Sequence, residues 1–147
     1  MLTHDQHLLV DHVRSTWAHS HAKATLAMLA LMLLQQRPRW AGELQDDLRD
    51  ISAGVFDVDV QTLHRMLRRL DRLSLIRCCE FESSGPGAAR KVFEATEVGI
   101  AALKAHLQHT LGYLTSATFA DAHRQLLDMP GPMCACHKDC TSAEDPQ

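Results

Sequence analysis

The sequence VDVQTLHRMLRRL, at residues 58–70, has the clearest helical pattern in this chain of 147 residues. Asp59 stands at a suitable N-cap position, since its side chain can accept a hydrogen bond from a backbone N–H of the first turn. Apolar residues then recur at spacings of three and four, and they are Leu63, Met66, Leu67, Leu70 and Leu73. This spacing predicts a helix that buries one face in a hydrophobic core.

The opposite face of the same helix is basic. Helical geometry groups polar side chains on it, and they are Gln61, Arg65, Arg68 and Arg72, with Thr62 and Arg69 beside them. Residues 61–91 hold seven basic and three acidic side chains, a balance of +4, so a chain of net charge −3 carries −7 elsewhere. Such a local excess of positive charge suits contacts with DNA phosphates. The alternative is a solvated face neutralised by salt bridges.

The segments on either side of this helix predict the rest of the fold. Residues 24–36 are almost all apolar and unbranched at Cβ, and residues 40–51 repeat apolar side chains at helical spacing, so both segments are predicted helices. Residues 75–82 and 90–95 are predicted strands, joined by a tip rich in Gly, Ser and Ala. Three helices and then a β-hairpin are typical of a winged helix-turn-helix, a mainly α (α+β) fold whose third helix enters the major groove.

Position along the third helix predicts what each polar side chain does. Gln61, Thr62 and Arg65 lie in its first turns, where side chains reach base edges. Farther along are predicted phosphate contacts, which fix register: Arg68, Arg69 and Arg72, with Arg90 and Lys91 from the hairpin. His64 can donate a hydrogen bond to a phosphate, or it can pack at the edge of the core.

A fourth helix, capped by Thr96, predicts how two chains associate. Its apolar seam consists of Ile100, Leu103, Leu107, Leu111 and Leu114. Because this helix has left the core, we expect the same helix of a second copy to cover the seam and form a homodimer. Gly112 and the stretch 115–118 predict a break before a last helical segment at 119–128.

The chain is expected to divide into four parts. The predicted boundaries are an N-terminal helical extension at 1–22, a winged-helix DNA-binding domain at 23–97, a C-terminal dimerisation helix region at 98–128, and a flexible Cys-rich tail at 129–147. The extension carries five histidines around an apolar stripe formed by Leu9, Val13 and Trp17. We expect the tail to be disordered without a ligand.

Three segments resemble PadR-type transcriptional regulators. Residues 58–70 resemble the recognition helix of that family, which opens with Thr-Leu-Tyr and continues with Leu-x-x-Leu. The sequence RKVFEATEVG at 90–99 resembles its basic-aromatic strand ending in Thr-Glu-x-Gly, and WAGEL at 40–44 resembles its second helix. Together the likeness covers about residues 24–110. It implies a dimeric winged-helix repressor, dimerised by the C-terminal helix and often with a small-molecule pocket near that interface.

Two residues depart from the family pattern. His64 stands where the family has a tyrosine on the recognition helix, which can alter base or phosphate contacts. Ser74 stands where the family usually has glycine before the hairpin. The extension and the tail lie outside the common core of the family, so the resemblance implies nothing about them.

The tail contains the motif Cys-x-Cys-His-x-x-Cys. Three thiolates and an imidazole, supplied by Cys134, Cys136, His137 and Cys140, are enough soft ligands for Zn²⁺, Cu⁺ or an iron–sulfur cluster. The motif therefore predicts a metal or redox sensor. Two alternatives stay open: a tail with adventitious thiols, or oxidation of Cys134 with Cys140. The histidines of the extension can complete a metal site or lie on a helix surface.

Both tryptophans and at least one of two adjacent cysteines are assigned to the core. Adjacent strand residues point to opposite faces of a sheet, so Cys78 and Cys79 do not easily chelate one ion, and at least one is predicted to be buried. Trp17 and Trp40 are predicted core residues rather than ligand platforms.

These observations predict a homodimeric transcriptional regulator that binds a palindromic double-stranded DNA operator, with two third helices about one DNA turn apart. Repression and control by a small-molecule effector follow from the resemblance, and control by metal from the tail. The alternative is a winged-helix module that binds protein, as an anti-repressor or assembly factor. Catalytic motifs are absent, so no enzyme is expected. No segment is long enough for a membrane span or fits a signal peptide, and we expect a cytoplasmic protein.

Overall fold

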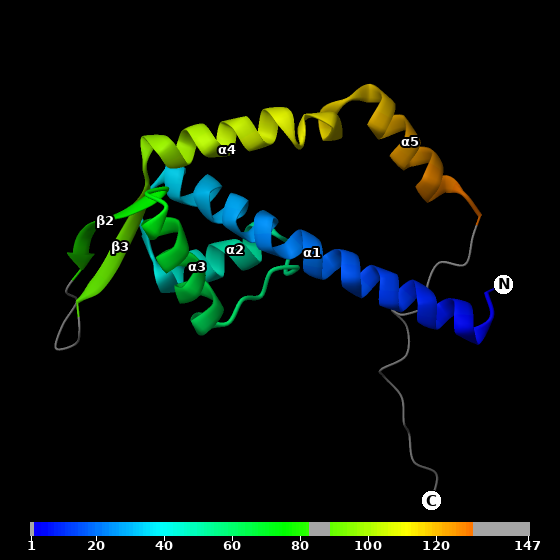
Figure 1. Cartoon of the computed structure of the whole chain (residues 1–147), viewed down its shortest axis with the longest axis horizontal. Coiled ribbons are helices and arrows are strands. Elements are labelled where there is room, and N and C mark those ends of the chain that lie inside the picture. Colours follow the sequence, from blue (N-terminus) through cyan, green and yellow to red (C-terminus); the bar gives the residue numbers. More distant parts are fainter. Residues whose placement is uncertain (1, 83–88, 131–147) are drawn as a thin grey trace, which may run out of the picture.

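The computed structural model describes residues 2–82 and 89–130, and these form helices around a small three-stranded sheet (Figure 1). In chain order the elements are α1 (His4–Gln36), β1 (Arg39–Trp40), α2 (Ala41–Ile51), α3 (Val60–Arg72), β2 (Ile76–Glu82), β3 (Arg90–Ala95), α4 (Glu97–His109), the 3-10 helix η1 (Gly112–Thr115) and α5 (Ala117–Asp128). This confirms the mainly helical fold with a β-hairpin after the third helix.

The core lies where α1, α2 and α3 meet. Four of the five apolar residues predicted on α3 are buried in it, and they are Leu63, Met66, Leu67 and Leu70. They pack with Leu34 of α1, Leu48 of α2 and Ile76 of β2 in one cluster. The fifth assignment is wrong, because Leu73 is 59% exposed. The helix ends at Arg72, so Leu73 no longer follows the helical face that enters the core.

The sheet is antiparallel with strand order β1-β3-β2. The hairpin of β2 and β3 is confirmed, with Ile76 opposite Ala95. The two-residue strand β1 pairs Trp40 with Val92 and is too short for any sequence pattern to reveal. Most of the predicted hairpin tip, residues 83–88, lies outside the described residues.

Both hairpin cysteines are exposed, so the expectation that Cys78 or Cys79 is a core residue is wrong. The strand β2 lies at the edge of the sheet, and the hairpin projects away from the helices, which leaves this part of it uncovered (Figure 1). A register shift between Cys78 and Glu80 also breaks the regular alternation of the strand.

Helix α1 is one continuous helix that contains both the predicted extension and the first predicted core helix. It begins with a capping box, in which Thr3 and Gln6 hydrogen-bond reciprocally. Its C-terminal half lies in the core, whereas its N-terminal half projects from the body of the molecule (Figure 1). Trp17 lies in the projecting half and is 72% exposed, so its core assignment is wrong. No described helix combines the length and the apolar character needed to cross a membrane.

A buried arginine joins α1 to α2. Arg39 is 5% exposed, and its Nε lies 2.6 Å from Oδ2 of Asp47 on α2. The Arg39 guanidinium also donates to the backbone carbonyl of Leu33, in the last turn of α1. A cation near a helix C-terminus is favourable, and here it shares the Leu33 carbonyl with the backbone N–H of Arg37. This contact holds β1, and thereby Trp40, in a defined position.

The predicted cap and break of the C-terminal region are confirmed. The side chain of Thr96 accepts a hydrogen bond from the backbone N–H of Gly99 at 3.1 Å, and η1 interrupts the helical path at Gly112. Two details differ, since α4 ends at His109 and α5 begins at Ala117, earlier than predicted.

The first half of the predicted seam packs on the core of its own chain. Leu103 is buried in the core of its own chain and Leu107 packs against that core, because α4 lies along α1. Leu111 and Leu114 come after the end of α4, and Leu114 is exposed. The expectation that one continuous helical seam waits for a partner is therefore wrong for its first half.

Candidate nucleic-acid interface

The first turn of α3 is fixed by its cap. Both the backbone N–H and the hydroxyl of Thr62 donate to the carboxylate of Asp59, at 2.9 and 2.6 Å. The hydrogen bond from the Thr62 hydroxyl has the larger effect on the pKa of Asp59, followed by the hydrogen bond from the Thr62 backbone N–H. Both hold this pKa below its usual value, because they favour the charged carboxylate. The donor of Thr62 is thus engaged within the helix, and its hydroxyl oxygen is left to accept a hydrogen bond.

The loop before α3 is tied to α2. The side-chain amide of Gln45 donates to the carbonyl of Val58 at 2.6 Å, and Arg49 pairs with Asp57 at 3.0 Å. These contacts set the position of the N-terminus of α3 relative to the core. A side chain on the exposed face of α3 is therefore carried by a rigid support rather than by a mobile loop.

The exposed face of α3 carries unpaired cations. Within the part of the chain that the structure describes, no carboxylate lies within ion-pair distance of four arginines, Arg65, Arg68, Arg69 and Arg72. Other arginines are paired, as with Arg77, whose guanidinium lies 2.5 Å from Glu94 on the neighbouring strand. Salt bridges between described side chains therefore do not neutralise this face of α3, and the alternative of a face that is merely solvated stays open.

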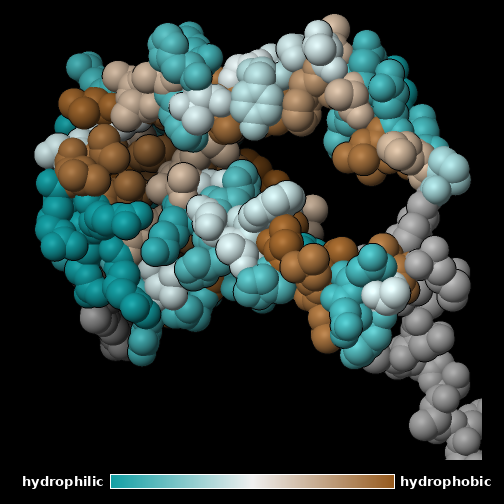
Figure 2. Space-filling model, turned by 45° about the vertical axis from the view of Figure 1, so that its right-hand side comes forward, coloured by the Kyte–Doolittle hydropathy of each residue, from teal (hydrophilic) through white to brown (hydrophobic). Residues whose placement is uncertain are grey.

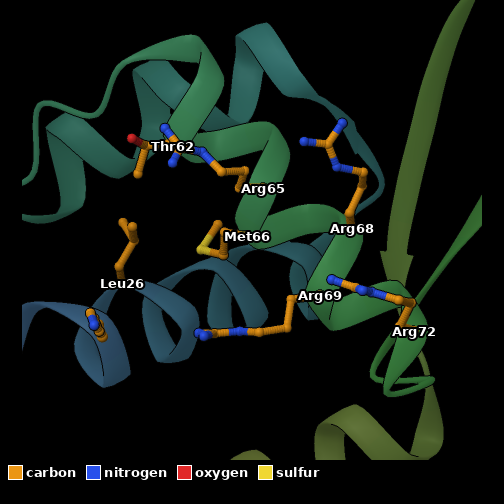
Figure 3. A pocket seen from close by; sticks show the side chains of 8 residues that line it. Leu26, Thr62, Arg65, Met66, Arg68, Arg69 and Arg72 are labelled. Carbon is orange, nitrogen blue, oxygen red and sulfur yellow. The ribbon is translucent and has the colours of Figure 1, made fainter.

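One hollow lies between α1 and α3, and we call it the α1-side hollow (Figure 3). Its volume is about 490 Å³, and it is lined by Lys23, Leu26, Thr62, Arg65, Met66, Arg68, Arg69 and Arg72. Leu26 and Met66 form an apolar floor between the two helices, and Arg69 extends from α3 towards α1 (Figure 3). Five cations and no acidic side chain line this hollow.

Lys23 is the residue of this hollow that sequence reasoning missed. It is an exposed side chain on α1, far from α3 in the sequence, and it stands alone at the start of an apolar segment. A single lysine has no pattern that marks it as a partner of the α3 arginines. Only the packing of α1 beside α3 shows that it belongs to the same basic surface.

A second hollow lies on the other side of α3, and we call it the wing-side hollow. Its volume is about 680 Å³, and it is lined by Trp40, Ala41, Gly42, Gln45, Asp46, Val60, Leu63, His64, Ala89, Arg90, Lys91 and Phe93. The fold thus brings His64 of α3 beside Arg90 and Lys91 of β3, as residues of one surface. Trp40 is partly buried here, with the Arg90 guanidinium 4.2 Å from the centre of its ring.

The predicted interface residues therefore lie on and beside α3. Gln61 is exposed on the first turn of the helix, five of the others line the α1-side hollow, and three line the wing-side hollow. In the major groove, phosphates of the two DNA strands lie on either side of an inserted helix. A helix flanked by cations on both sides matches that arrangement.

The predicted metal ligands Cys134, Cys136, His137 and Cys140 lie outside the described residues. Within residues 2–82 and 89–130, no three His, Cys, Asp or Glu side chains are grouped closely enough to hold a metal ion. The five histidines of the predicted extension lie on the exposed half of α1. The tail motif therefore stays a prediction.

Comparison with known proteins gives the family. The sequence profile described as the transcriptional regulator PadR-like family matches residues 30–105. This chain belongs to that family. The matched region runs from the core half of α1 through most of α4, so it includes α2, α3 and the hairpin. Among curated proteins, no sequence matches the chain.

Solved structures of PadR-like proteins share the fold. A PadR family transcriptional regulator from Eggerthella lenta is 24% identical, with a TM-score of 0.60, 83% of this chain and 98% of that chain covered. A PadR-like transcription factor from Bacteroides fragilis is 23% identical, with a TM-score of 0.55, and the match covers 78% of this chain and 98% of that chain. Bacillus subtilis PadR, solved in complex with operator DNA, is 14% identical, with a TM-score of 0.52, and the match covers 71% of this chain and 60% of that chain.

Proposed function

We propose that this PadR-like regulator binds double-stranded DNA through α3 and the two hollows beside it. The observation that carries the proposal is the set of cations on both sides of the exposed face of α3. Within a chain of net charge −3, such a cluster directs a polyanion to one surface and leaves the rest repulsive to it. Family membership and the operator complex of the Bacillus subtilis relative support the same partner. They also support a role in regulation rather than catalysis.

The proposed contacts divide into two classes. Gln61, Thr62 and Arg65 contact base edges, because they lie in the first turns of α3. The phosphate contacts come from His64 and from six cations, which are Arg68, Arg69, Arg72, Arg90, Lys91 and, in addition, Lys23. In the same proposal residues 23–97 form the DNA-binding unit and residues 98–128 the dimerisation region.

A homodimer is the second part of the proposal. The projecting half of α1 exposes Leu8, Leu9 and Trp17, and α5 exposes Leu126 and Leu127. Figure 2 shows apolar surface on these two segments and open space between them. An apolar surface of this extent on a soluble regulator favours a partner, and a second copy of the chain would present the same two segments in return.

The predicted seam then has two roles. Leu103 and Leu107 hold α4 on its own chain, whereas Leu111 and Leu114 join the apolar surface of α5 at the dimer contact. Two α3 helices related by a two-fold axis would read a palindromic site. Repression is proposed from the resemblance to PadR-type repressors. Metal or redox control through the cysteines of the tail is the last part of the proposal, supported by the motif alone.

The test of DNA binding is fluorescence anisotropy of a labelled duplex of random sequence, titrated with protein between 50 and 200 mM salt. Binding that weakens steeply with salt is the expected result, because phosphate contacts release counterions. Absence of binding, or binding indifferent to salt, would contradict the proposal and favour a protein-binding module. Sedimentation of Leu114→Asp against the wild type tests the dimer, which the added charge should weaken.

The tail requires its own experiment. The metal and sulfide content of protein purified without air is measured beside a variant in which Cys134, Cys136 and Cys140 are replaced by Ser. A metal or cluster present only in the parent protein supports sensing, and operator binding is then compared for the loaded and stripped forms. Equal metal content in the two proteins contradicts this part of the proposal without affecting DNA binding.

A further inference from the structure

Two adjacent cysteines on the hairpin, Cys78 and Cys79, have no part in the proposed DNA contacts. Both side chains are exposed on β2, which is an edge strand of the sheet. The hairpin projects away from the helices (Figure 1), so a reagent in solution can reach this part of it. The Sγ of Cys79 lies 3.5 Å from the backbone carbonyl oxygen of Val92 on β3, and a thiol is a weak donor, so this contact costs little to replace.

A β-bulge at this pair changes how the two side chains are directed. Cys78 pairs with Phe93 and Glu80 pairs with Val92, so Cys79 is the extra residue of β2. In a regular strand, adjacent side chains point to opposite faces, and this alternation would keep two neighbouring thiols apart. A bulge sets two residues of one strand against one residue of the other and redirects a side chain. Strict alternation therefore does not separate Cys78 from Cys79.

The short distance along the backbone favours a bridging atom over a direct disulfide. The peptide bond between the two cysteines is trans, which sets their Cα atoms about 3.8 Å apart. Disulfides usually join Cα atoms that are about 4.4–6.8 Å apart, and other geometries store strain. An atom that bonds both sulfurs lets the sulfurs stay farther apart than a direct S–S bond does. Such an atom therefore suits this pair better than oxidation.

From these observations we infer that Cys78 and Cys79 form a dithiol site for a trivalent arsenical, a compound whose arsenic(III) atom bonds two sulfurs. In the reaction an arsenic atom that carries two hydroxyl groups, as in hydrated phenylarsine oxide, exchanges both for sulfur. Two As–O and two S–H bonds break, two As–S bonds form, and each hydroxyl leaves as water with a thiol proton. Arsenic stays trivalent, so the step needs no oxidant or reductant.

Occupation of this site changes the hairpin next to two proposed phosphate contacts. Cys79 contacts the carbonyl of Val92, and Lys91 and Arg90 precede Val92 on β3. A bound arsenical adds bulk beside these cations, where a DNA backbone has to approach them. As far as this consequence rests on the proposed function, the arsenical weakens DNA binding.

The probe for this site is phenylarsine oxide, added to the full chain in which Cys134, Cys136 and Cys140 are replaced by Ser. The chain has five cysteines, so only Cys78 and Cys79 remain in this parent protein. The intact mass should show one phenylarsenic group in place of two hydrogen atoms per chain. Because the second thiol acts as an intramolecular ligand, releasing half of the adduct should require roughly 100-fold more 2-mercaptoethanol for the parent than for its Cys79→Ser derivative.

Cys78→Ser and Cys79→Ser in this parent are the matched controls. Each exchanges one sulfur for oxygen at an exposed position and keeps one thiol, and an unchanged thermal midpoint shows that the variant folds. Labelling with N-ethylmaleimide checks that the remaining thiol is accessible. Absence of an adduct on the parent protein would overturn the inference. So would an arsenic atom that links two chains, or an adduct that 2-mercaptoethanol releases equally from the parent and from both variants.

Binding of a labelled duplex separates this inference from the proposed function. Phenylarsine oxide should weaken duplex binding by the parent protein roughly tenfold, about the effect of losing one charged contact, and 2,3-dimercaptopropanol should restore it. An adduct on both thiols that leaves duplex binding unchanged keeps the site and overturns its effect on DNA. Untreated protein that binds no duplex contradicts the proposed function, whereas the mass and release measurements still decide the dithiol site.

Discussion

Lys23→Ala should reduce the salt dependence of DNA binding, because Lys23 lines the α1-side hollow and no described carboxylate lies within ion-pair distance of it. Each phosphate contact contributes about 0.9 to the slope of log K against log salt concentration, so two copies in a dimer contribute about 1.8. Between 50 and 200 mM salt the logarithm of the salt concentration changes by about 0.6. The factor by which this salt increase weakens DNA binding should therefore be roughly 12 times smaller for the variant than for the wild type.

The assay is fluorescence anisotropy with a labelled duplex at several salt concentrations. The matched control is Lys104→Ala, which removes the same charge from an exposed position on α4, the helix on the opposite side of the core from α3 (Figure 1). A wild-type slope is expected for the control. If Lys23→Ala also keeps the wild-type slope, the α1-side hollow does not contact phosphate. An equal reduction in both variants would show a general charge effect and refute the assignment equally.

Three further predictions follow from α3 and its neighbours. Arg65→Ala should reduce discrimination between operator and random duplex by about 1–3 kcal/mol, as measured by competition, because it removes a base contact that phosphate residues do not supply. Gly99→Ala should lower the thermal midpoint although alanine favours helix, since its Cβ would strike the carbonyl of Leu75; Gly112→Ala, with its nearest neighbour 3.8 Å away, is the control expected to have little effect. The pKa of Asp59 is lowered by folding, so its cap stabilises the protein above the ordinary value of 3.8 and is lost as pH falls through the lowered pKa; the gap in urea midpoint between wild type and Asp59→Ala should thus close in acid, and a constant gap would contradict it.

Features that depend on neighbours in the sequence could be predicted. The caps at Asp59 and Thr96 use residues three positions away, and the four buried side chains of α3 follow helical periodicity. The hairpin also follows from composition and turn residues. These local signals determined the order of elements, and that order is enough to assign the winged helix.

Features that depend on distant residues could not. Lys23 reaches the basic surface because α1 packs beside α3, and Trp40 meets Arg90 because β1 joins β3. Neither pair has a spacing that a pattern could detect. The two hollows, which turn a list of basic residues into a surface with a shape, are therefore products of packing alone.

Apolar periodicity also left open which chain covers a helical face. Periodicity predicts that a partner covers Leu103, which is buried in its own chain, and that Trp17 lies in its own core, whereas it is exposed. Both residues have the spacing of a covered face, because the hydrophobic effect depends on removing apolar area from water and not on which chain removes it. The position of α4 along α1 decides the first case, and the projection of α1 beyond the core decides the second. In the proposed homodimer, the exposed apolar residues of α1 and α5 are the part of the pattern that a second copy would cover.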